Sequence, residues 1–595
     1  MKDSDDLVVN PSKVSPVCSE MSRRLLLKIG ASGLVGVSLS QTVSASQKPG
    51  NKFSFFDEVG TAQTGDLQLA DGFEYKKVIG FGDPLKSGMS PYSSENLNAE
   101  EQQWRFGGNC DFTHFFQDSE NPLKGILCVN NESPEFGTNP NRDEREKAAY
   151  YSVGCSIVAL EKNDSGVWQP DLSSPLNRRI TPDTPAVITG DAAGNSRLIS
   201  KASPDGVKSA GTIGNCAGGF TPWGTYLTAE ENIQSYFSGD VKKHPEKENM
   251  KRFGMDGKNH FFQKVDKRFD LNSEYQSPLH FGWIVEIDPR NPDEPIKKHS
   301  CLGRAKHECA MMTIDKNGHA VVYTSDDQAF EYIYKFVSAQ KYKEGDREHN
   351  KKLLESGTLH AAKFKEDGTM EWIPLLFGKG PLTAKNGFKS QGDVFLDTRK
   401  AADLMKATPM DRPEDIAIHP ETGKVYFFMT GNRSRKENQK NCANNVARGS
   451  GHIIEMSSNH HELKAQWNFL VVCGAHLKDD SNSKFAKETT HSGRFVYPDN
   501  GCFDKEGELW ICSDGYGFPG FSDGLWHCQI EGNRGLSRRF ATAPVKSEFT
   551  GPCFTRDGKV LFLAVQHPGN VGKSNFPDFD GQRARSSVVM IRRKG

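Results

Sequence analysis

Several motifs that would assign this 595-residue chain to a common enzyme class are absent from its sequence. No Gly-rich phosphate loop follows a strand-like run, which argues against a P-loop nucleotide-binding protein. No Gly-x-Ser-x-Gly segment is present, so a serine hydrolase of the nucleophile-elbow type has no anchor. His307-Glu308 is followed by Met311, where a zinc protease needs a second histidine, and this disfavours that class.

The sequence also has little net charge and no long apolar run. Lys and Arg total 75 against 76 Asp and Glu, a formal net charge of −1. Without a strong positive field, nucleic acid is not expected as a specific partner. The apolar run at 29–39 is short and glycine-rich, so no stable membrane span is expected. With 36% hydrophobic residues, the chain has the composition of a soluble globular protein with a large core.

The 13 cysteines include no Cys-x-x-Cys pair and are scattered along the chain. This spacing differs from that of a zinc ribbon or a compact disulfide framework. We therefore expect most of them to be buried thiols and leave open one or two disulfide bridges.

Residues 1–45 are interpreted as a targeting segment. The sequence SRRLLLK at 22–28 resembles a twin-arginine export motif, with Leu26 in the place of the usual aromatic residue. Residues 43–45, VSA, resemble an Ala-x-Ala cleavage site. We predict that the twin-arginine export machinery moves the folded protein to the periplasm or the extracellular space. An uncleaved anchor is the alternative.

Residues 46–595 are predicted to form a single domain built on a repeated pattern. A tight turn of acidic residues and glycine precedes each of five strand-like runs, HAVVYTS, TMEWIPL, KVYFFMT, ELWICS and KVLFLAV. Most intervals are about 50–55 residues, close to the length of a four-stranded blade. We predict an all-β fold, a β-propeller with loop insertions near 233–275 and 339–354 that we interpret as solvated surface. A pair of β-sandwiches is the competing fold.

The most unusual stretch is 211–232, GTIGNCAGGFTPWGTYLTAEEN. Glycines around Cys216 permit positive φ and close backbone approach, and a short strand is expected to end at Glu230-Glu231. A thiolate prefers transition metals and carboxylates prefer hard cations, so a site that uses both suggests iron or a mixed cluster. The alternative is a buried free cysteine beside two surface glutamates.

Oxygen-bearing side chains also stand at the ends of other predicted strands. Asn109 and Asp111 follow two glycines, Glu132 follows the run ILCVNN, and Asp499 and Asp514 bracket a further strand. Such oxygens would suit calcium in a propeller channel. Each residue also fits the simpler role of a turn residue that caps a hairpin.

The segment MDRPED at 410–415 combines Arg412 with three carboxylates around a proline. Arginine binds phosphate or carboxylate through two parallel hydrogen bonds. An arginine beside metal-binding acids is therefore the arrangement that phosphoryl transfer needs. A salt-bridged turn is the alternative.

Taken together, five segments resemble the PhoX-type alkaline phosphatases: NCAGGFTPWGTYLTAEEN, GWIVEIDP with LGRAKHE, TPMDRPEDIAIHP, PDNGCFDKEGELWICSDG and GPCFTRDGKVLFLAVQHPG. The resemblance extends from about residue 60 to the C-terminus. It implies a six-bladed β-propeller whose channel holds Fe3+ and Ca2+. It also implies an enzyme, usually exported by the twin-arginine pathway, that hydrolyses small-molecule phosphomonoesters with a metal-bound oxygen as the nucleophile. We expect a monomer.

The resemblance also implies roles for individual residues. Cys216 matches the iron-bound cysteine, Arg412 matches the arginine that holds the substrate phosphate, and the metal-binding glutamates correspond to Glu231, Glu308 and Glu414. The calcium ligands are assigned from chemistry and position to Asn109, Asp111, Glu132, Asp499 and Asp514. Two questions stay open: whether Glu230 is a ligand or only a neighbour of Glu231, and whether Cys110 or Cys309 brings a second sulfur to the cluster.

Two other functions remain as alternatives. A calcium-dependent propeller lactonase would also use carboxylates and asparagine in a channel, but it has no use for Cys216. An exported binding propeller without enzymatic activity would hold the metals and turn over no phosphate ester, because a fold alone does not determine a function.

Overall fold

The computed structural model describes residues 8–10, 53–61, 64–259, 261–444, 449–474, 483–515, 523–569 and 574–595. The predicted export motif at 22–28 and the cleavage site at 43–45 lie outside the described residues. Within the ranges above, every helix is too short or too polar to serve as a transmembrane span.

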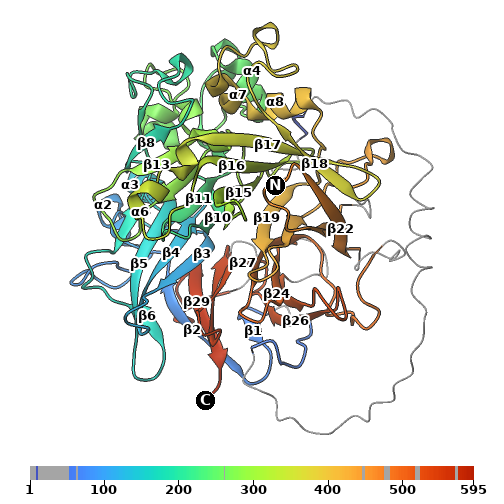
Figure 1. The fold of residues 1–595 in the computed structure, drawn as a ribbon. Helices are drawn as coiled ribbons and strands as arrows, with labels where there is room; N and C mark the ends of the chain where they lie inside the picture. Colours follow the sequence, from blue (N-terminus) through green and yellow to red (C-terminus); the bar gives the residue numbers. More distant parts are fainter. Residues whose placement is uncertain are drawn as a thin grey trace, which may run out of the picture.

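The described chain consists mainly of antiparallel strands in five sheets (Figure 1). One sheet joins the two ends of the domain, in the order β2 (Phe73–Gly80), β29 (Ser587–Arg593), β28 (Val560–Gln566) and β27 (Glu548–Phe554). The next contains β3 (Cys110–Gln117), β4 (Lys124–Asn131), β5 (Gly154–Lys162) and β6 (Trp168–Pro170), with β7 (Arg178–Ile180) paired to β5.

The other three sheets complete the fold. The third runs β10 (Asn215–Phe220), β11 (Tyr226–Glu230), β12 (Ile284–Ile287), β13 (Ile296–His299), β8 (Pro185–Thr189) and β9 (Lys208–Ala210). A nine-stranded sheet runs β14 (Met311–Ile314), β15 (His319–Ser325), β16 (Ile333–Lys341), β17 (Gly357–Phe364), β18 (Thr369–Pro374), β22 (Lys464–Val472), β21 (His452–Met456), β20 (Val425–Met429) and β19 (Pro413–Ile418). The fifth runs β1 (Gln68–Leu69), β26 (Ser537–Thr542), β25 (Gly524–Cys528), β24 (Leu509–Ser513) and β23 (Pro498–Phe503).

Six strands from these sheets form a closed ring of contacts, in the order β3, β10, β14, β19, β23 and β27, and β27 contacts β3 again. Figure 1 shows β3, β10, β19 and β27 around the middle of the molecule. The predicted all-β propeller is therefore confirmed. The number of blades stays a prediction, because the nine-stranded sheet joins two runs of strands through β18 and β22.

The predicted turns are confirmed. Strands β15, β18, β20, β24 and β28 each follow one of the acidic-Gly turns. The glycine of every such turn has a positive φ: Gly318, Gly368, Gly423, Gly507 and Gly558. Because only glycine adopts this backbone conformation without steric cost, these residues fix where each strand begins.

The helices are short and lie outside the ring of strands. They are α2 (Ala99–Gln102), α3 (Arg142–Tyr150), α4 (Lys247–Arg252), α5 (Phe262–Val265), α6 (Arg347–Asn350), α7 (Gln391–Leu396) and α8 (Thr398–Met405). Single turns of 3₁₀ helix occur at η1 (Ser196–Leu198), η2 (Ile233–Tyr236), η3 (Val241–Lys243), η4 (Lys267–Phe269), η5 (Pro278–His280), η6 (Ser300–Leu302), η7 (Leu353–Glu355), η8 (Ala384–Asn386) and η9 (Glu437–Gln439). Figure 1 shows α4, α7 and α8 gathered on one side of the molecule.

The interpretation of 233–275 as solvated surface is wrong. This insertion contributes to a buried cluster that also includes Tyr150 and Phe281, and its Phe237, Phe262 and Phe269 are each 0% exposed. Its Lys, Asp and Asn residues dominate the composition, but the aromatic side chains between them supply the apolar area that a small core needs. The 339–354 insertion likewise buries Leu353 and Leu354 beneath its charged residues.

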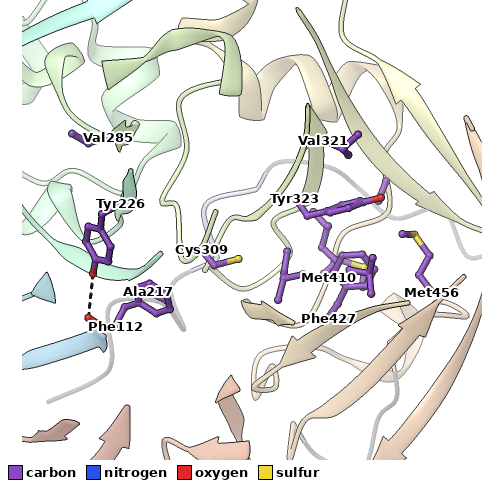
Figure 2. Close-up of a cluster of buried hydrophobic side chains, with 14 of the residues drawn as sticks. Phe112, Ala217, Tyr226, Val285, Cys309, Val321, Tyr323, Met410, Phe427 and Met456 are labelled. Atoms are coloured by element: carbon purple, nitrogen blue, oxygen red, sulfur yellow. Dashed lines mark hydrogen bonds between the residues drawn. The ribbon is translucent and has the colours of Figure 1, made fainter. Parts of the chain in front are cut away.

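A further core cluster extends between neighbouring sheets (Figure 2). Figure 2 shows Cys309 between two sets of side chains, one made of Phe112, Ala217 and Tyr226 and the other of Tyr323, Met410, Phe427 and Met456. Among the described residues all twelve cysteines are free thiols, and most are buried. The prediction of buried thiols is confirmed, and this part of the chain contains no disulfide bridge.

Candidate metal centre

The antiparallel hairpins bring together side chains that are distant in the sequence. We call the six strands of the ring the inner strands. At one end of each hairpin, the start of an inner strand faces the end of the strand that follows it in the sequence. Cys110 pairs with Asn131, Asn215 with Glu230, Pro498 with Ser513 and Glu548 with Gln566. Since the inner strands form a ring, polar residues at these ends can surround one common site.

In four inner strands, the pairing with the neighbouring strand shifts in register at the position of a candidate ligand. The shifts occur in β3, β10, β19 and β23, and the residues inside them include Asp111, Cys216, Glu414 and Asp499. A β-bulge redirects a side chain out of the regular alternation of a strand. The bulges therefore explain how residues on well-paired strands can point toward one another at the end of the ring.

These side chains meet in overlapping groups, within each of which the candidate ligand atoms lie within 4.8 Å of one another. The groups are Asp111-Cys216-Glu308, Glu132-Cys216-Glu231, Glu231-Glu308-Asp327, Glu308-Glu414-Asp499 and Asp499-Asp514-Glu548. Because neighbouring groups share members, the ten residues form one continuous arrangement, which we call the acidic cluster. It contains eight of the nine predicted metal ligands.

Asn109 is the remaining predicted ligand and lies next to the acidic cluster. Its backbone carbonyl accepts a hydrogen bond from the amide of Glu132 at 3.0 Å. Its side-chain nitrogen donates to the carbonyl oxygens of Ser133 and Pro134, at 3.1 and 3.4 Å. Asn109 thus supports the loop that carries Glu132, and its role as a ligand stays a prediction.

Two members of the acidic cluster were missed by the sequence analysis, Asp327 and Glu548. Asp327 lies two residues after β15, and Glu548 is the first residue of β27. The signal that could have found both is positional, because the other members also stand at the start of an inner strand or the end of the next strand. Gln566, at the end of β28, donates from Nε2 to Glu132 Oε2 at 2.6 Å.

The acidic cluster concentrates negative charge in a buried place. Burial first, and repulsion by neighbouring carboxylates second, raises the pKa values of its buried acids well above their usual range: Asp111, Glu308, Glu414, Asp499 and Glu548. The same two causes raise the pKa of the Cys216 thiol. So many carboxylates can all be ionised together only if cations balance them.

Unpartnered oxygens show that the residues fit metal ions. Asp111 Oδ1, Glu308 Oε1 and Asp499 Oδ1 are buried without a hydrogen-bond partner in the described part of the chain. A buried polar atom normally has a partner, so these oxygens point to ligands that the polypeptide does not supply. Carboxylate oxygens suit hard cations, and the thiol beside them suits a transition metal.

Arg412 lies at the edge of the acidic cluster. Its guanidinium donates from Nε to Asp327 Oδ1 at 3.1 Å and from Nη2 to Asp327 Oδ2 at 2.6 Å, and it lies 3.3 Å from Glu414 Oε1. Its backbone is left-handed, with φ 54°. A left-handed residue other than glycine is strained by about 1–2 kcal/mol, so the surrounding structure must hold it in place.

The open questions on the neighbouring residues have structural answers. Glu230 accepts from Lys298 Nζ at 2.7 Å and from the backbone amides of Gly282 and Trp283, so it is a structural neighbour of Glu231. Cys309 Sγ lies 3.3 Å from Ser325 Oγ, and Cys110 Sγ lies 3.7 Å from the carbonyl oxygen of Val565. Neither sulfur belongs to a group of the acidic cluster, in which Cys216 is the one sulfur among described residues.

The bulge that contains Cys216 contacts the Asn130 side chain, and the strand beyond it passes close to the backbone of Ala310. The Asn130 side-chain nitrogen donates to the carbonyl oxygens of Cys216 and Ala217, at 2.5 and 3.0 Å. The predicted close approach also occurs, since a Cβ on Gly219 would lie 2.0 Å from the carbonyl oxygen of Ala310. Gly214 has a positive φ of 60°, as expected.

A β-propeller whose central ring surrounds ten carboxylate and thiol side chains that could hold metal ions defines the class of protein, a propeller with a candidate metal centre. The family model for alkaline phosphatase PhoX matches residues 54–569, and the chain belongs to this family. Membership makes it a phosphoric monoester hydrolase, an alkaline phosphatase of a metal-dependent family. No match was found among curated protein sequences.

Solved structures support the same conclusion. Pseudomonas fluorescens PhoX, in complex with vanadate as a transition state analogue, is 32% identical, covers 90% of this chain and 98% of its own, and has a TM-score of 0.84. A gluconolactonase from Xanthomonas campestris is 9% identical over 91% of this chain and 99% of its own, with a TM-score of 0.33. The low score means that this likeness gives the lactonase alternative no support.

Proposed function

We propose that the acidic cluster holds Fe3+ beside Cys216 and Ca2+ among the carboxylates, and that phosphomonoesters are hydrolysed at this site. The observation that carries the proposal is the sharing of Cys216 between two groups of carboxylates, with ligand atoms within 4.8 Å. A thiolate favours a transition metal, whereas several carboxylate oxygens without a thiolate favour calcium.

When bound, the cations would polarise the phosphate oxygens and lower the pKa of water, which makes a side-chain nucleophile unnecessary. Arg412 would donate two hydrogen bonds to nonbridging oxygens of the phosphate. Asp327 holds the plane of its guanidinium, with contacts of 2.6 and 3.1 Å. Because negative charge spreads over the equatorial oxygens in the transition state, a fixed guanidinium stabilises that state more than a mobile one.

Oxyanion binding at this site is supported by the vanadate complex of the Pseudomonas fluorescens protein. We propose that vanadate also inhibits the present enzyme by occupying the position next to Arg412. Small phosphomonoesters are the proposed substrates.

We also propose export by the twin-arginine pathway to the periplasm or the extracellular space, and a monomer as the active form. The motif at 22–28 supports this route. A site assembled from six inner strands requires a folded chain to hold its metals, and a pathway for folded proteins would allow the metals to be acquired before export.

The test is hydrolysis of 4-nitrophenyl phosphate by the protein recovered after twin-arginine export. Cys216→Ala should lose activity and bound iron while it keeps the circular dichroism spectrum of the wild type. Cys309→Ala is the control, because Cys309 is a free thiol that lies outside the acidic cluster, and it should stay active. A Cys216→Ala variant with the wild-type rate would refute the proposal, and calcium-dependent lactone hydrolysis without iron would favour the lactonase alternative.

A further inference from the structure

A buried network of ion pairs connects the 233–275 insertion with the loop that carries Asp327. Arg252, the last residue of α4, donates to both carboxylate oxygens of Glu331, at 2.5 and 2.7 Å. It also donates to both oxygens of Asp403 in α8, at 2.9 and 3.0 Å. The Glu331 side chain is 0% exposed and the Arg252 side chain 11% exposed, so water contributes little to this arrangement.

Arg399 in α8 completes the network. Its Nε donates to Asp326 Oδ2 at 2.8 Å, its Nη2 donates to Asp326 Oδ1, and its Nε lies 3.7 Å from Glu331 Oε2. Two arginines therefore hold the two ends of the 326–331 loop. Removing one partner of a buried ion pair leaves a charge without compensation, so each contact constrains the position of the loop strongly.

The same loop holds the segment around Arg412. Phe330 donates its backbone amide to Met410 at 2.9 Å, and Met410 donates its own to Glu331 at 2.8 Å. Phe330, with φ 72°, and Arg412, with φ 54°, both adopt the left-handed backbone. Strained residues persist only where their surroundings determine them, and these two segments hold each other. Asp327, inside the loop, aligns the Arg412 guanidinium directly.

We propose that Arg252 and Arg399 are positioning residues for Arg412. Their ion pairs with Glu331 and Asp326 fix the 326–331 loop, and through Asp327 this loop presents the Arg412 guanidinium to the substrate phosphate. The 233–275 insertion is then a functional part of the active site, although none of its residues belongs to the acidic cluster. This inference rests on the proposed role of Arg412.

The test begins with Arg252→Gln in the full-length, metal-loaded enzyme. A displacement of about 1 Å at a reacting group reduces rates by as much as about 100-fold, so we expect kcat/KM to fall by about 10- to 100-fold. Inhibition by vanadate should weaken in parallel, while iron and calcium contents stay at wild-type levels. Arg252→Lys, which keeps the charge, should recover part of the lost activity.

Arg268→Gln is the matched control. Arg268 lies in the same insertion and forms ion pairs with Asp266 at 2.5 Å and Asp183 at 3.2 Å, but it does not contact the 326–331 loop. It should change the melting temperature by a similar amount and leave kcat/KM unchanged.

A double variant separates positioning from general stability. If Arg252 acts through Arg412, then Arg252→Gln should cause no further loss of kcat/KM in an Arg412→Ala background. An equal loss in both backgrounds, or a wild-type kcat/KM for Arg252→Gln, would overturn the inference. Should Arg252→Gln fail to fold, Glu331→Gln, which preserves side-chain shape, carries the same comparison. An inactive wild type would overturn the proposed function and this inference together, whereas an active wild type with an unaffected Arg252→Gln would overturn this inference alone.

Discussion

Replacing Asn130 with alanine should loosen the bulge that presents Cys216. The Asn130 side chain is 0% exposed and donates to the carbonyl oxygens of Cys216 and Ala217, at 2.5 and 3.0 Å. It also accepts a hydrogen bond from the Tyr226 hydroxyl at 2.9 Å. Alanine removes all of these bonds and leaves the buried carbonyl oxygen of Ala217 and the part-buried carbonyl oxygen of Cys216 without this donor.

The expected loss of stability follows from the two carbonyl groups. A buried polar group that loses its partner costs about 1–3 kcal/mol and a part-buried one costs less, so the variant should lose about 1–4 kcal/mol of unfolding free energy. The Tyr226 hydroxyl keeps the carbonyl oxygen of Phe112 as a partner, at 3.2 Å, and adds little to this sum. Iron binding should weaken as well, because the bulge sets the position of the Cys216 sulfur.

The assay is urea unfolding of the wild type and the variant, together with iron content per chain. Asn177→Ala is a matched control, since Asn177 is also buried and donates to two carbonyl oxygens, those of Leu85 and Asp171, at 3.1 and 2.7 Å. The control should lose comparable stability and keep its iron. An Asn130→Ala variant with wild-type stability and full iron content would refute the reasoning.

Three further predictions concern other parts of the molecule. Arg412→Ala should lower kcat/KM for phosphomonoesters by about 10²- to 10³-fold, as expected for the loss of one fixed donor, and an unchanged value would exclude its role. Gly219→Ala should lower the unfolding free energy by about 2 kcal/mol or more, because its Cβ would lie 2.0 Å from the Ala310 carbonyl oxygen, and an unchanged melting temperature would contradict this. Burial lowers the pKa of Lys335 from 10.5 to about 7, so the folded state releases its proton more readily than the unfolded state. The wild type should therefore gain stability relative to Lys335→Met as pH rises from about 7 to 10.5, and melts at pH 6, 8 and 10 that show a constant difference would disprove it.

Local chemistry made much of the fold predictable. The turns that end at Gly318 and Gly507 could be recognised because a tight turn needs a particular residue type at a particular place. The short strand that ends near Glu230 was predicted for a similar reason, since a short apolar run after the Pro222-Trp223-Gly224 turn has few alternatives. These signals do not depend on the rest of the chain.

The composition of the acidic cluster depends on distant parts of the chain. Nothing in the local sequence distinguishes Asp327 or Glu548 from other acidic residues beside a strand, and only the closed ring of inner strands brings them near Glu231 and Asp499. The bulge that directs Cys216 toward Asp111 arises from pairing between strands, which local sequence does not specify. The buried aromatic residues of 233–275 were missed for a different reason, because charged residues dominate the composition of that segment.

The most direct measurement is the hydrolysis of 4-nitrophenyl phosphate at alkaline pH by the exported protein, before and after calcium chelation. We predict that chelation abolishes turnover, that added Ca2+ restores it, and that iron stays bound to the wild type but not to Cys216→Ala. Turnover that continues after calcium and iron have both been removed would contradict a metal-dependent site in the acidic cluster.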